Sequence, residues 1–486
     1  MNHINILIVF LSYTAILFFI SWLTSRGASN ASFFIGDKKS PWYIVAYGMI
    51  SASLSGVTFI SIPGLVGTEN FSYMMIVFGY LLGYFVIAKF LLPIYYKLNL
   101  TSIYTYLHQR FGVFSYKTGA SFFLLSRIIG ASFRMFLVIN ILQIFVFNQL
   151  GIPFGVTVIG FIALIVLYTY QAGIKTIVWT DTLQTTFMLL AVGLTLYYIS
   201  DDLQLSLKEL YHRIDNLGLT QIINTDTNHK SFYLKQFFSG AFIAIVMTGL
   251  DQDMMQKNLS CSNIKDAQKN IISLSWALIP VNFAFLTLGG ILFYFAQQKG
   301  ITINGTSDNL FPTIALSHLS IGAGIVFIIG LIAAAYSSAD SALTSLTTSF
   351  SIDILGIERN NNLNAPQKEN RRKKVHLGMA FILILVISAY ELINDQAIIT
   401  KLFTIAGYTY GPLLGLFAFG IFSKRKIRDQ IVPLIAIAAP ILSYIIKWAT
   451  PLLFYNYEIG FELLIINGLL MYTGLYFISF KNTKYN

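Results

Sequence analysis

The sequence predicts an all-α integral membrane protein with about thirteen transmembrane helices, and three observations support this fold class. Of the 486 residues, 56% are hydrophobic and only 11% are charged, whereas a soluble globular domain carries about 25% charged residues. The 41 Phe and 28 Tyr suit lipid-facing helices and interfacial aromatic belts. Apolar stretches of about 20 residues, the length that crosses a bilayer, recur along the whole chain.

The expected spans follow one another with short connections. They fall near residues 4–23, 43–67, 72–95, 120–147, 153–171, 176–199, 233–255, 271–296, 321–354, 375–390, 398–422, 431–449 and 460–480. The first is expected to be a retained helix and not a signal peptide, because positive charge follows its apolar run instead of preceding it. The longest polar insertions are expected to form a short surface excursion at about 200–231 and a flexible basic loop at 356–374. We therefore expect residues 1–486 to form a single transmembrane domain.

Basic residues gather in alternate loops. Arg110 and the clusters at 371–374 and 424–428 fall on one side, while the opposite loops hold few basic residues, among them Lys208 and Lys299. Because cytoplasmic loops are enriched in Lys and Arg, this asymmetry predicts a multi-pass protein of the cell (inner) membrane with its N-terminus outside and its C-terminus in the cytoplasm. The same asymmetry accounts for the net charge of +11, so no nucleic-acid partner is expected.

Residues 331–345, L-I-A-A-A-Y-S-S-A-D-S-A-L-T-S, place hydroxyls and a carboxylate within a membrane-length apolar run. An intramembrane carboxylate is costly unless it is hydrated, paired or bound to a cation. Hard oxygen ligands on one helix suit a small hard cation such as Na⁺. The pattern predicts a cation site that involves Ser337, Ser338, Asp340 and Ser341. The alternative is that the serines only pack between helices, as Ser and Thr often do in membranes.

Residues 51–64, S-A-S-L-S-G-V-T-F-I-S-I-P-G, combine several hydroxyls with Gly56, Pro63 and Gly64, which weaken a helix. A broken helix at membrane depth frees backbone carbonyls, and these are tolerated where they bind an ion or a substrate. The alternative is a simple proline kink. With residues 334–341 as a second polar and discontinuous segment, the pattern predicts a transporter built from inverted repeats.

Polar residues in other spans require partners or a function. Arg127 and Arg134 are seven residues apart and share a helix face. Either one can offer a planar fork to a substrate carboxylate, or pair with an acid of another helix. Asp181 is expected either to cap its helix or to reach the core. The stretch 251–256, D-Q-D-M-M-Q, is expected at a cytoplasmic helix end, where its polar residues cap the helix or pair locally.

The chain resembles the sodium/solute symporter family, whose members couple the uptake of sugars, amino acids, vitamins or organic anions to Na⁺ influx. Four stretches carry the resemblance, in the order and spacing of the family: F-F-I-G-D-K-K-S-P-W-Y at 33–43, G-I-K-T-I-V-W-T-D-T-L-Q at 173–184, T-G-L-D-Q-D-M-M-Q-K-N-L-S at 248–260 and A-Y-S-S-A-D-S-A-L at 335–343. The resemblance implies thirteen helices and a five-plus-five inverted repeat of the LeuT type, with broken first repeat helices. The parts would be an extra helix at 4–23, repeats at 43–199 and 232–422, and C-terminal helices within 431–480.

The resemblance also implies the ion-binding residues. By alignment, the main Na⁺ would be held by the carbonyls of Ser51, Leu54 and Ala334 and the hydroxyls of Ser337 and Ser338. Some members bind a second Na⁺, and the matching positions for a second ion or for coupling are Asp181, Asp340 and Ser341. Asp340 stands where the two-sodium members carry Ser, which speaks against a second ion in this chain.

Substrate contacts in the family come from the broken helix and the next two helices. The matching candidates are Ser53, Ser55, Thr58, Phe59 and Tyr80, with Arg127 or Arg134 added for an anionic substrate. The Asn, Glu and Gln of the sugar-transporting members are absent from the broken helix, where Ser53, Val57 and Thr58 stand. This departure argues against a sugar specialist.

We therefore predict a Na⁺-coupled symporter that imports a small polar solute, such as sialic acid, an amino acid or another organic acid. Its expected partners are the solute, Na⁺ as coupling ion and the lipid bilayer, with no obligate protein partner. The alternatives are a Na⁺ symporter of a neutral sugar or vitamin, and a transporter-like sensor or channel protein. The chain lacks the G-x-x-x-x-G-K-[ST] motif of ATP-driven pumps and the H-E-x-x-H spacing of a zinc enzyme. Neither a primary pump nor an enzyme is expected.

Overall fold

The computed structural model describes residues 3–26, 29–170, 173–303, 305–391, 398–453 and 457–480. These residues are nearly all helical. Two short strands, β1 (Lys426–Ile427) and β2 (Ser479–Phe480), pair antiparallel near the end of the described chain. The predicted all-α class is confirmed.

Ten helical segments of the described residues are long and apolar enough to cross a membrane. They are formed by α1 (His3–Thr24), α3 (Trp42–Glu69), α4 (Tyr73–Val86) with its continuation α5 (Leu92–Lys97), α7 (Val113–Leu142), α9 (Ile174–Leu203), α13 (Ile264–Gln298), α15 (Ile321–Ser349), α16 (Ala365–Tyr390), α17 (Ile398–Phe422) and α18 (Val432–Leu453). An eleventh candidate is the bent pair of α11 (Tyr233–Ala244), extended by η5 (Ile245–Gly249), with α12 (Gln252–Leu259). The shorter apolar helices α8 (Phe154–Thr169) and α19 (Leu463–Phe477) lie where the remaining two spans are expected.

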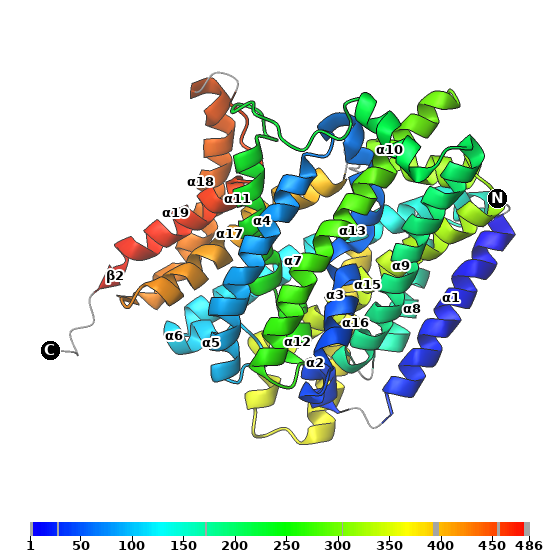
Figure 1. Cartoon of the computed structure of the whole chain (residues 1–486). Helices are drawn as coiled ribbons and strands as arrows, with labels where there is room; N and C mark the ends of the chain where they lie inside the picture. Colours follow the sequence, from blue (N-terminus) through cyan, green and yellow to red (C-terminus); the bar gives the residue numbers. More distant parts are fainter. Residues whose placement is uncertain are drawn as a thin grey trace.

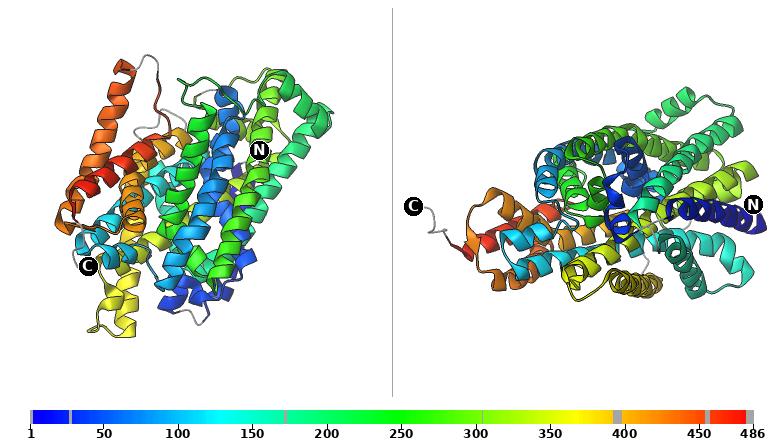
Figure 2. Two further views of the ribbon diagram at one scale, coloured as in Figure 1. Left: turned by 60° about the vertical axis from the view of Figure 1, so that its left-hand side comes forward. Right: turned by 90° about the horizontal axis from the view of Figure 1, so that it is seen from below.

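The helices form one bundle with α3 and α15 at its centre (Figure 1). In the most apolar stretch of α3, 89% of the residues are buried, against 22% in α18. In Figure 1 and in the right-hand view of Figure 2, helix α1 lies on one flank, and α18 and α19 lie at the opposite end of the molecule. An apolar face that the protein does not cover suits contact with lipid, so the peripheral helices are those expected to border the bilayer.

The predicted break within residues 51–64 is confirmed, and it lies at Ser55 of α3 (φ 58°, ψ 175°). Pro63 continues the helix, so the simple proline kink does not describe this segment. Gly56 follows the break and lets α7 approach closely, because a Cβ atom there would lie 2.7 Å from Cγ2 of Val138. A non-glycine residue with positive φ stores strain, and such strain is found mainly at functional sites.

The expected discontinuity at residues 334–341 is wrong, because these residues lie inside the continuous helix α15. Neither Gly nor Pro interrupts residues 331–349. The serine hydroxyls bond back to the preceding turn: Ser338 donates to the carbonyl of Ala334 at 3.1 Å, and Ser341 donates to that of Ser337 at 2.8 Å. Such bonds accommodate serine within a helix.

The second break instead separates η5 from α12, which are bent by 64°. Asp251 ends the gap as the N-cap of α12, and its side chain accepts a hydrogen bond from the backbone N–H of Asp253 at 2.8 Å. The capping role expected for this stretch is therefore confirmed for Asp251. Residues 251–259 are all buried at the helix break, and the expected place of the stretch at a cytoplasmic helix end stays a prediction.

The polar insertions contain more helix than expected. Residues 356–374 are not a flexible loop throughout, because α16 begins at Ala365. Asn364 accepts a hydrogen bond from the N–H of Gln367, and Gln367 accepts one from the N–H of Asn364. This capping box starts the helix and carries the basic residues onto it. The excursion at 200–231 contains α10 (Leu207–Asn216). The smaller helices are α2 (Asn30–Ile35), α6 (Thr105–Arg110) and α14 (Leu310–Thr313).

Candidate ion and substrate site

The residues expected to hold the main Na⁺ meet where α3 crosses α15. The hydroxyls of Ser51 and Ser337 lie 2.9 Å apart and are buried. Ser338 lies beside Ser337, with its hydroxyl on the carbonyl of Ala334, and Leu54 directly precedes the break in α3. Hydroxyl oxygens from the two helices thus meet in a buried place, and hard neutral oxygens of this kind suit an alkali cation.

Helix α9 fixes the position of this part of α3. Gly48 lets the two helices pack closely, since a Cβ atom there would lie 3.0 Å from Cβ of Asp181. The hydroxyl of Thr185 accepts a hydrogen bond from the backbone N–H of Ser51 at 3.1 Å and donates one to the carbonyl of Tyr47 at 3.0 Å. The position of Ser51 is therefore set from α9 as well as from its own helix.

Asp181 of α9 reaches the core and does not cap its helix. Its Oδ1 atom accepts a hydrogen bond from the hydroxyl of Ser337 at 2.9 Å, and its Oδ2 atom lies 2.6 Å from Nζ of Lys257. Both side chains of this ion pair are only 1% exposed. Lys257 belongs to α12 and was not singled out in the sequence, although it closes the T-G-L-D-Q-D-M-M-Q-K stretch. The pair connects α12 to the candidate ion site through Ser337.

The other two candidates for a second ion have different partners. Asp340 accepts a hydrogen bond from the hydroxyl of Tyr168 at 2.7 Å and one from the backbone N–H of Ser341 at 2.6 Å. The hydroxyl of Ser341 donates to the carbonyl of Ser337 and lies 3.4 Å from Oδ2 of Asp253. In the described residues, no hydrogen bond or ion pair joins the side chains of Asp181, Asp340 and Ser341 to one another. Tyr168 carried no sequence signal for this role.

The two arginines of α7 have different environments. Arg127 forms an ion pair with Asp253 and lies 3.8 Å from Oδ2 of Asp251, which also accepts a hydrogen bond from Tyr410. Residues 251–256 were expected to cap the helix or to pair locally. For Asp253 the expected local pairing is wrong, because its partner Arg127 belongs to another helix. Arg134 is 8% exposed, and within the described ranges it forms no ion pair and its Nε atom has no hydrogen-bond partner.

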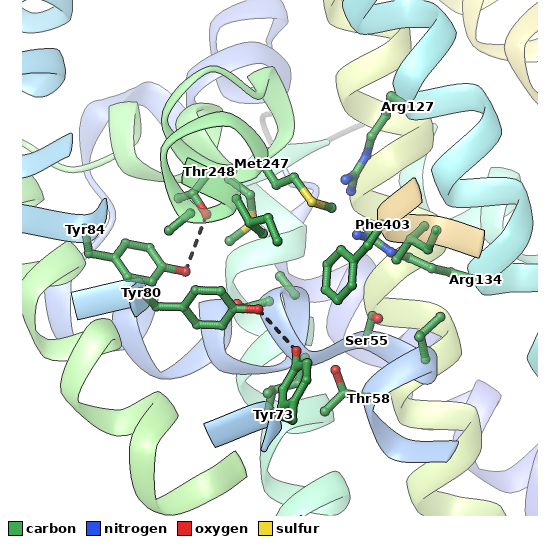
Figure 3. Close-up of a pocket in the computed structure, with 18 residues that line it drawn as sticks. Ser55, Thr58, Tyr73, Tyr80, Tyr84, Arg127, Arg134, Met247, Thr248 and Phe403 are labelled. Carbon is green, nitrogen blue, oxygen red and sulfur yellow. Dashed lines mark hydrogen bonds between the residues drawn. The ribbon is translucent and has the colours of Figure 1, made fainter. Parts of the chain in front are cut away.

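Arg134 lines a cavity of about 60 Å³ beside the break in α3, shown in Figure 3. Five more of the expected substrate residues line the same cavity: Ser53, Ser55, Thr58, Tyr80 and Arg127. The guanidinium of Arg134 points toward the centre, next to the ring of Phe403 (Figure 3). Since a water needs about 10–15 Å³ of such space, the cavity holds roughly four or five waters in this conformation. A larger solute requires its walls to move.

Aromatic residues from distant parts of the chain complete the cavity. The hydroxyls of Tyr73 and Tyr80 lie 3.2 Å apart, and those of Tyr84 and Thr248 lie 3.4 Å apart (Figure 3). Phe403 of α17 also lines it. Four lining residues were not expected from the sequence, namely Tyr73, Tyr84, Thr248 and Phe403. An aromatic or hydroxyl residue in a membrane helix carries no local sequence signal of the cavity that it faces.

Phe59, expected to contact substrate, lies elsewhere. Its ring is fully buried among Phe285, Phe311 and Phe327, with ring centroids 5.3–5.9 Å away, and it does not line the cavity. Successive helix residues point about 100° apart. Thr58 faces the cavity, and its neighbour Phe59 therefore faces the packed interior.

Residues 33–429 match the sequence model of the sodium:solute symporter family. The chain is 24% identical to a sodium/sialic acid symporter, SiaT, of Proteus mirabilis, over 90% of this chain and 89% of that one. It is 25% identical to the sodium/sialic acid symporter NanT of Aliivibrio fischeri, over 96% and 92%. A sodium/glucose cotransporter of Vibrio parahaemolyticus is 23% identical over 72% and 68%.

Two solved structures share the fold. A Na⁺-coupled sialic acid symporter in a substrate-bound outward-open state superposes with a TM-score of 0.84, covering 98% of this chain and 99% of that one at 21% identity. The nucleobase-cation symporter Mhp1 in a closed conformation superposes with a TM-score of 0.60, covering 92% and 94% at 14% identity. The fold is therefore shared with proteins of low sequence identity.

Proposed function

The chain belongs to the sodium:solute symporter family, and we propose that this Na⁺-coupled membrane symporter imports a sugar acid of the sialic acid type. One observation carries the proposal: the Arg134 guanidinium lies buried in a hydroxyl-rich cavity without an ion pair among the described residues. The similarity to sodium/sialic acid symporters over most of the chain supports the same substrate class.

A buried cation is costly unless it is paired, and a solute carboxylate supplies the partner that Arg134 lacks. The planar guanidinium matches a carboxylate with two parallel hydrogen bonds. The hydroxyls of Ser55, Thr58 and Tyr80 can bond to the polar groups of the solute. Arg127 is already neutralised by Asp253, so we assign it to the protein framework. Tyr73 and Phe403 border the cavity, and we propose that they separate when the solute enters.

For the coupling ion, we propose a Na⁺ held by Ser51, Leu54, Ala334, Ser337 and Ser338. The carboxylate of Asp181 orients Ser337 by a hydrogen bond, and Lys257 balances its charge. We propose that Asp181, Asp340 and Ser341 support coupling and do not bind a second Na⁺. The Oδ2 atom of Asp181 is occupied by Lys257 and that of Asp340 by Tyr168.

For the transport cycle, we propose thirteen spans with the N-terminus outside, and two inverted repeats at 43–199 and 232–422. Two broken elements support this organisation: α3 at Ser55, and the bent pair α11–α12, each the first helix of its repeat. Discontinuous helices at corresponding places of two repeats are typical of transporters that expose a central site to each side in turn. We propose that the protein works as a transporter alone, with no enzymatic step and no obligate protein partner.

The test is uptake of labelled sialic acid into proteoliposomes with and without an inward Na⁺ gradient. In the wild type, unlabelled acid should compete at least tenfold better than its neutral methyl ester, since hydrogen bonds between charged groups contribute about 1.5–3 kcal/mol. Arg134→Lys should lose this preference, because an ammonium lacks the fork. Arg127→Lys should keep it, because the ammonium can still pair with Asp253.

Two results would contradict the proposal. Equal competition by the methyl ester in the wild type would indicate a neutral solute. Normal uptake and preference in Arg134→Lys would show that Arg134 is part of the framework.

A further inference from the structure

Basic side chains from three helices meet at one end of the bundle. Nζ of Lys175, in the first turn of α9, lies 3.5 Å from the carbonyl oxygen of Arg26, which follows α1. Thr24 and Thr176 join the ends of these two helices, because their hydroxyls lie 2.8 Å apart. Arg26 and Lys175 are therefore held next to each other.

Helix α16 adds positive charge at the same end. The hydroxyl of Ser21 in α1 donates to the carbonyl of Tyr168 at 2.7 Å, which holds the end of α8 against α1. Tyr170 directly follows α8, and Nζ of Lys373 in α16 lies 5.2 Å from the centre of its ring. Lys374 is the next residue of α16 and is exposed. We call Arg26, Lys175, Lys373 and Lys374 the basic cluster.

Most of the charge of the basic cluster is uncompensated. Lys373 pairs with Glu369 at 2.8 Å, and the other three members form no ion pair among the residues that the structure describes. The guanidinium of Arg26 lies 4.0 Å above the ring of Trp22, which is 56% exposed. Exposed tryptophan is typical of the depth of the lipid headgroups. Lys and Arg clusters at that depth attract anionic lipids.

An apolar cavity of about 310 Å³ lies between α1, α8 and the end of α7. Phe10 of α1 and Gly160, Phe161 and Leu164 of α8 are among the residues that line it. Leu164 precedes Tyr170 by six residues, or about 9 Å along a helix. The hydrocarbon of one leaflet is about 15 Å deep, half of the bilayer core. An acyl chain whose headgroup lies at the basic cluster therefore reaches this cavity.

We infer that an anionic phospholipid binds here, with its phosphate on the basic cluster and an acyl chain in the apolar cavity beside α1 and α8. A soluble anion gains only the charges, and a zwitterionic lipid gains mainly the cavity, so the site selects a ligand that has both parts. The bound lipid stabilises the contact of α1 with α8. Through the hydrogen bond from Tyr168 to Asp340, α8 is also connected to α15, the helix of the candidate ion site.

The test is thermal unfolding of the full-length protein in detergent during titration with phosphatidylglycerol. Phosphatidylcholine with the same acyl chains and glycerol phosphate are titrated in parallel. A ligand of the folded state raises the unfolding midpoint as its concentration rises, which gives an apparent dissociation constant. Phosphatidylglycerol should bind at least tenfold more tightly than phosphatidylcholine. Glycerol phosphate, which carries the anion without acyl chains, should cause no shift at the same concentrations.

The first variant removes two charges of the basic cluster. Arg26→Gln combined with Lys175→Gln should weaken phosphatidylglycerol binding about thirtyfold, because each Lys or Arg near a membrane surface contributes about fivefold. The matched control is Lys424→Gln combined with Arg428→Gln. It removes the same charge from two exposed residues that form no ion pair within the described ranges, and it should keep the wild-type affinity.

The second variant fills the cavity. A Cβ atom at Gly160 meets no atom within 4 Å, so Gly160→Leu occupies the cavity without displacing a helix. It should weaken phosphatidylglycerol binding about tenfold, the effect of losing two buried methylene groups. Gly155→Leu is the matched control, because Gly155 is equally open and does not line the cavity. It should keep the wild-type affinity.

Several results would overturn the inference. Equal affinity for the two phospholipids would show that the charges select nothing, and a shift caused by glycerol phosphate alone would indicate a site for a soluble anion. Unchanged affinity in Gly160→Leu or in the Arg26 and Lys175 double variant would separate the lipid from the cavity or from the cluster. Equal losses in a variant and its control would show a general effect of charge or of side-chain size.

Discussion

Removing either member of the Asp181–Lys257 pair should destabilise the protein more than removing both. The two side chains are 2.6 Å apart and 1% exposed, and loss of one partner from such a pair costs about 3–5 kcal/mol, because the other charge stays buried alone. Asp181→Asn leaves Lys257 near Asp340, with which it interacts. Lys257→Met leaves two carboxylates, Asp181 and Asp340, without that cation. We therefore expect Lys257→Met to be the less stable single variant.

The assay is a double-mutant cycle on thermal unfolding of the detergent-solubilised protein, using Asp181→Asn, Lys257→Met and the combination. The combined variant buries no unpaired member of this pair, so it should recover most of the stability, giving a coupling energy of about 3 kcal/mol or more. Lys257→Met should also gain more stability from added Na⁺ than the wild type, because a cation can take the vacated place.

The same three variants are also assayed for Na⁺-dependent uptake, which gives the Na⁺ concentration at half-maximal transport. Asn keeps an acceptor for the Ser337 hydroxyl but loses its charge, which weakens that hydrogen bond by about 1 kcal/mol. The half-saturating Na⁺ concentration in Asp181→Asn should therefore rise roughly fivefold. Strictly additive losses of stability would refute the pairing argument. An unchanged Na⁺ response in Asp181→Asn would refute the link from Asp181 to the ion site.

Two further predictions concern the ion site and the aromatic barrier. Ser338→Ala should raise the half-saturating Na⁺ concentration about tenfold through the loss of one ligand. The control is Ser345→Ala, which should leave this concentration unchanged, because the hydroxyl of Ser345 only donates to the carbonyl of Ala342 in the same helix. Equal effects of the two substitutions would refute the assignment of Ser338 as a ligand. Phe403→Ala should open the substrate cavity toward the neighbouring cavity that Glu69 and Lys230 line. Bound sialic acid should then be released faster in an isotope-chase measurement, and an unchanged release rate would show that the ring is no barrier.

Hydropathy predicted the apolar helices well, because backbone groups in a bilayer must be satisfied within each segment. Each span expected from the sequence coincides with an apolar helix of the described residues, except 233–255, which coincides with the bent pair α11–α12. The broken segment was also predictable, since Gly56, Pro63 and Gly64 weaken a helix locally. The position of the break was not, because it depends on how closely α7 packs against Gly56.

Residue chemistry predicted the candidate ion site but misjudged its local geometry. The S-S-A-D stretch indicated a buried oxygen-rich site, yet a polar segment need not be a broken one. In α15, serine hydroxyls satisfy carbonyls of the same helix. The second break lies at Asp251, whose side chain can cap a helix start, and the sequence alone does not distinguish that cap from one at a helix end in water.

The sequence by itself determined that this chain is a helical membrane protein, which family it resembles, and which hydroxyls form the candidate ion site. Only the tertiary structure decided how its buried charges pair. Arg127 and Arg134 have the same residue type and the same helix face, but Asp253 lies beside Arg127 and no described carboxylate pairs with Arg134. The partners of Asp181 and Arg127 come from helices far away in the chain. Which side chains meet across a helix interface depends on the packing of whole helices, and no local pattern encodes it.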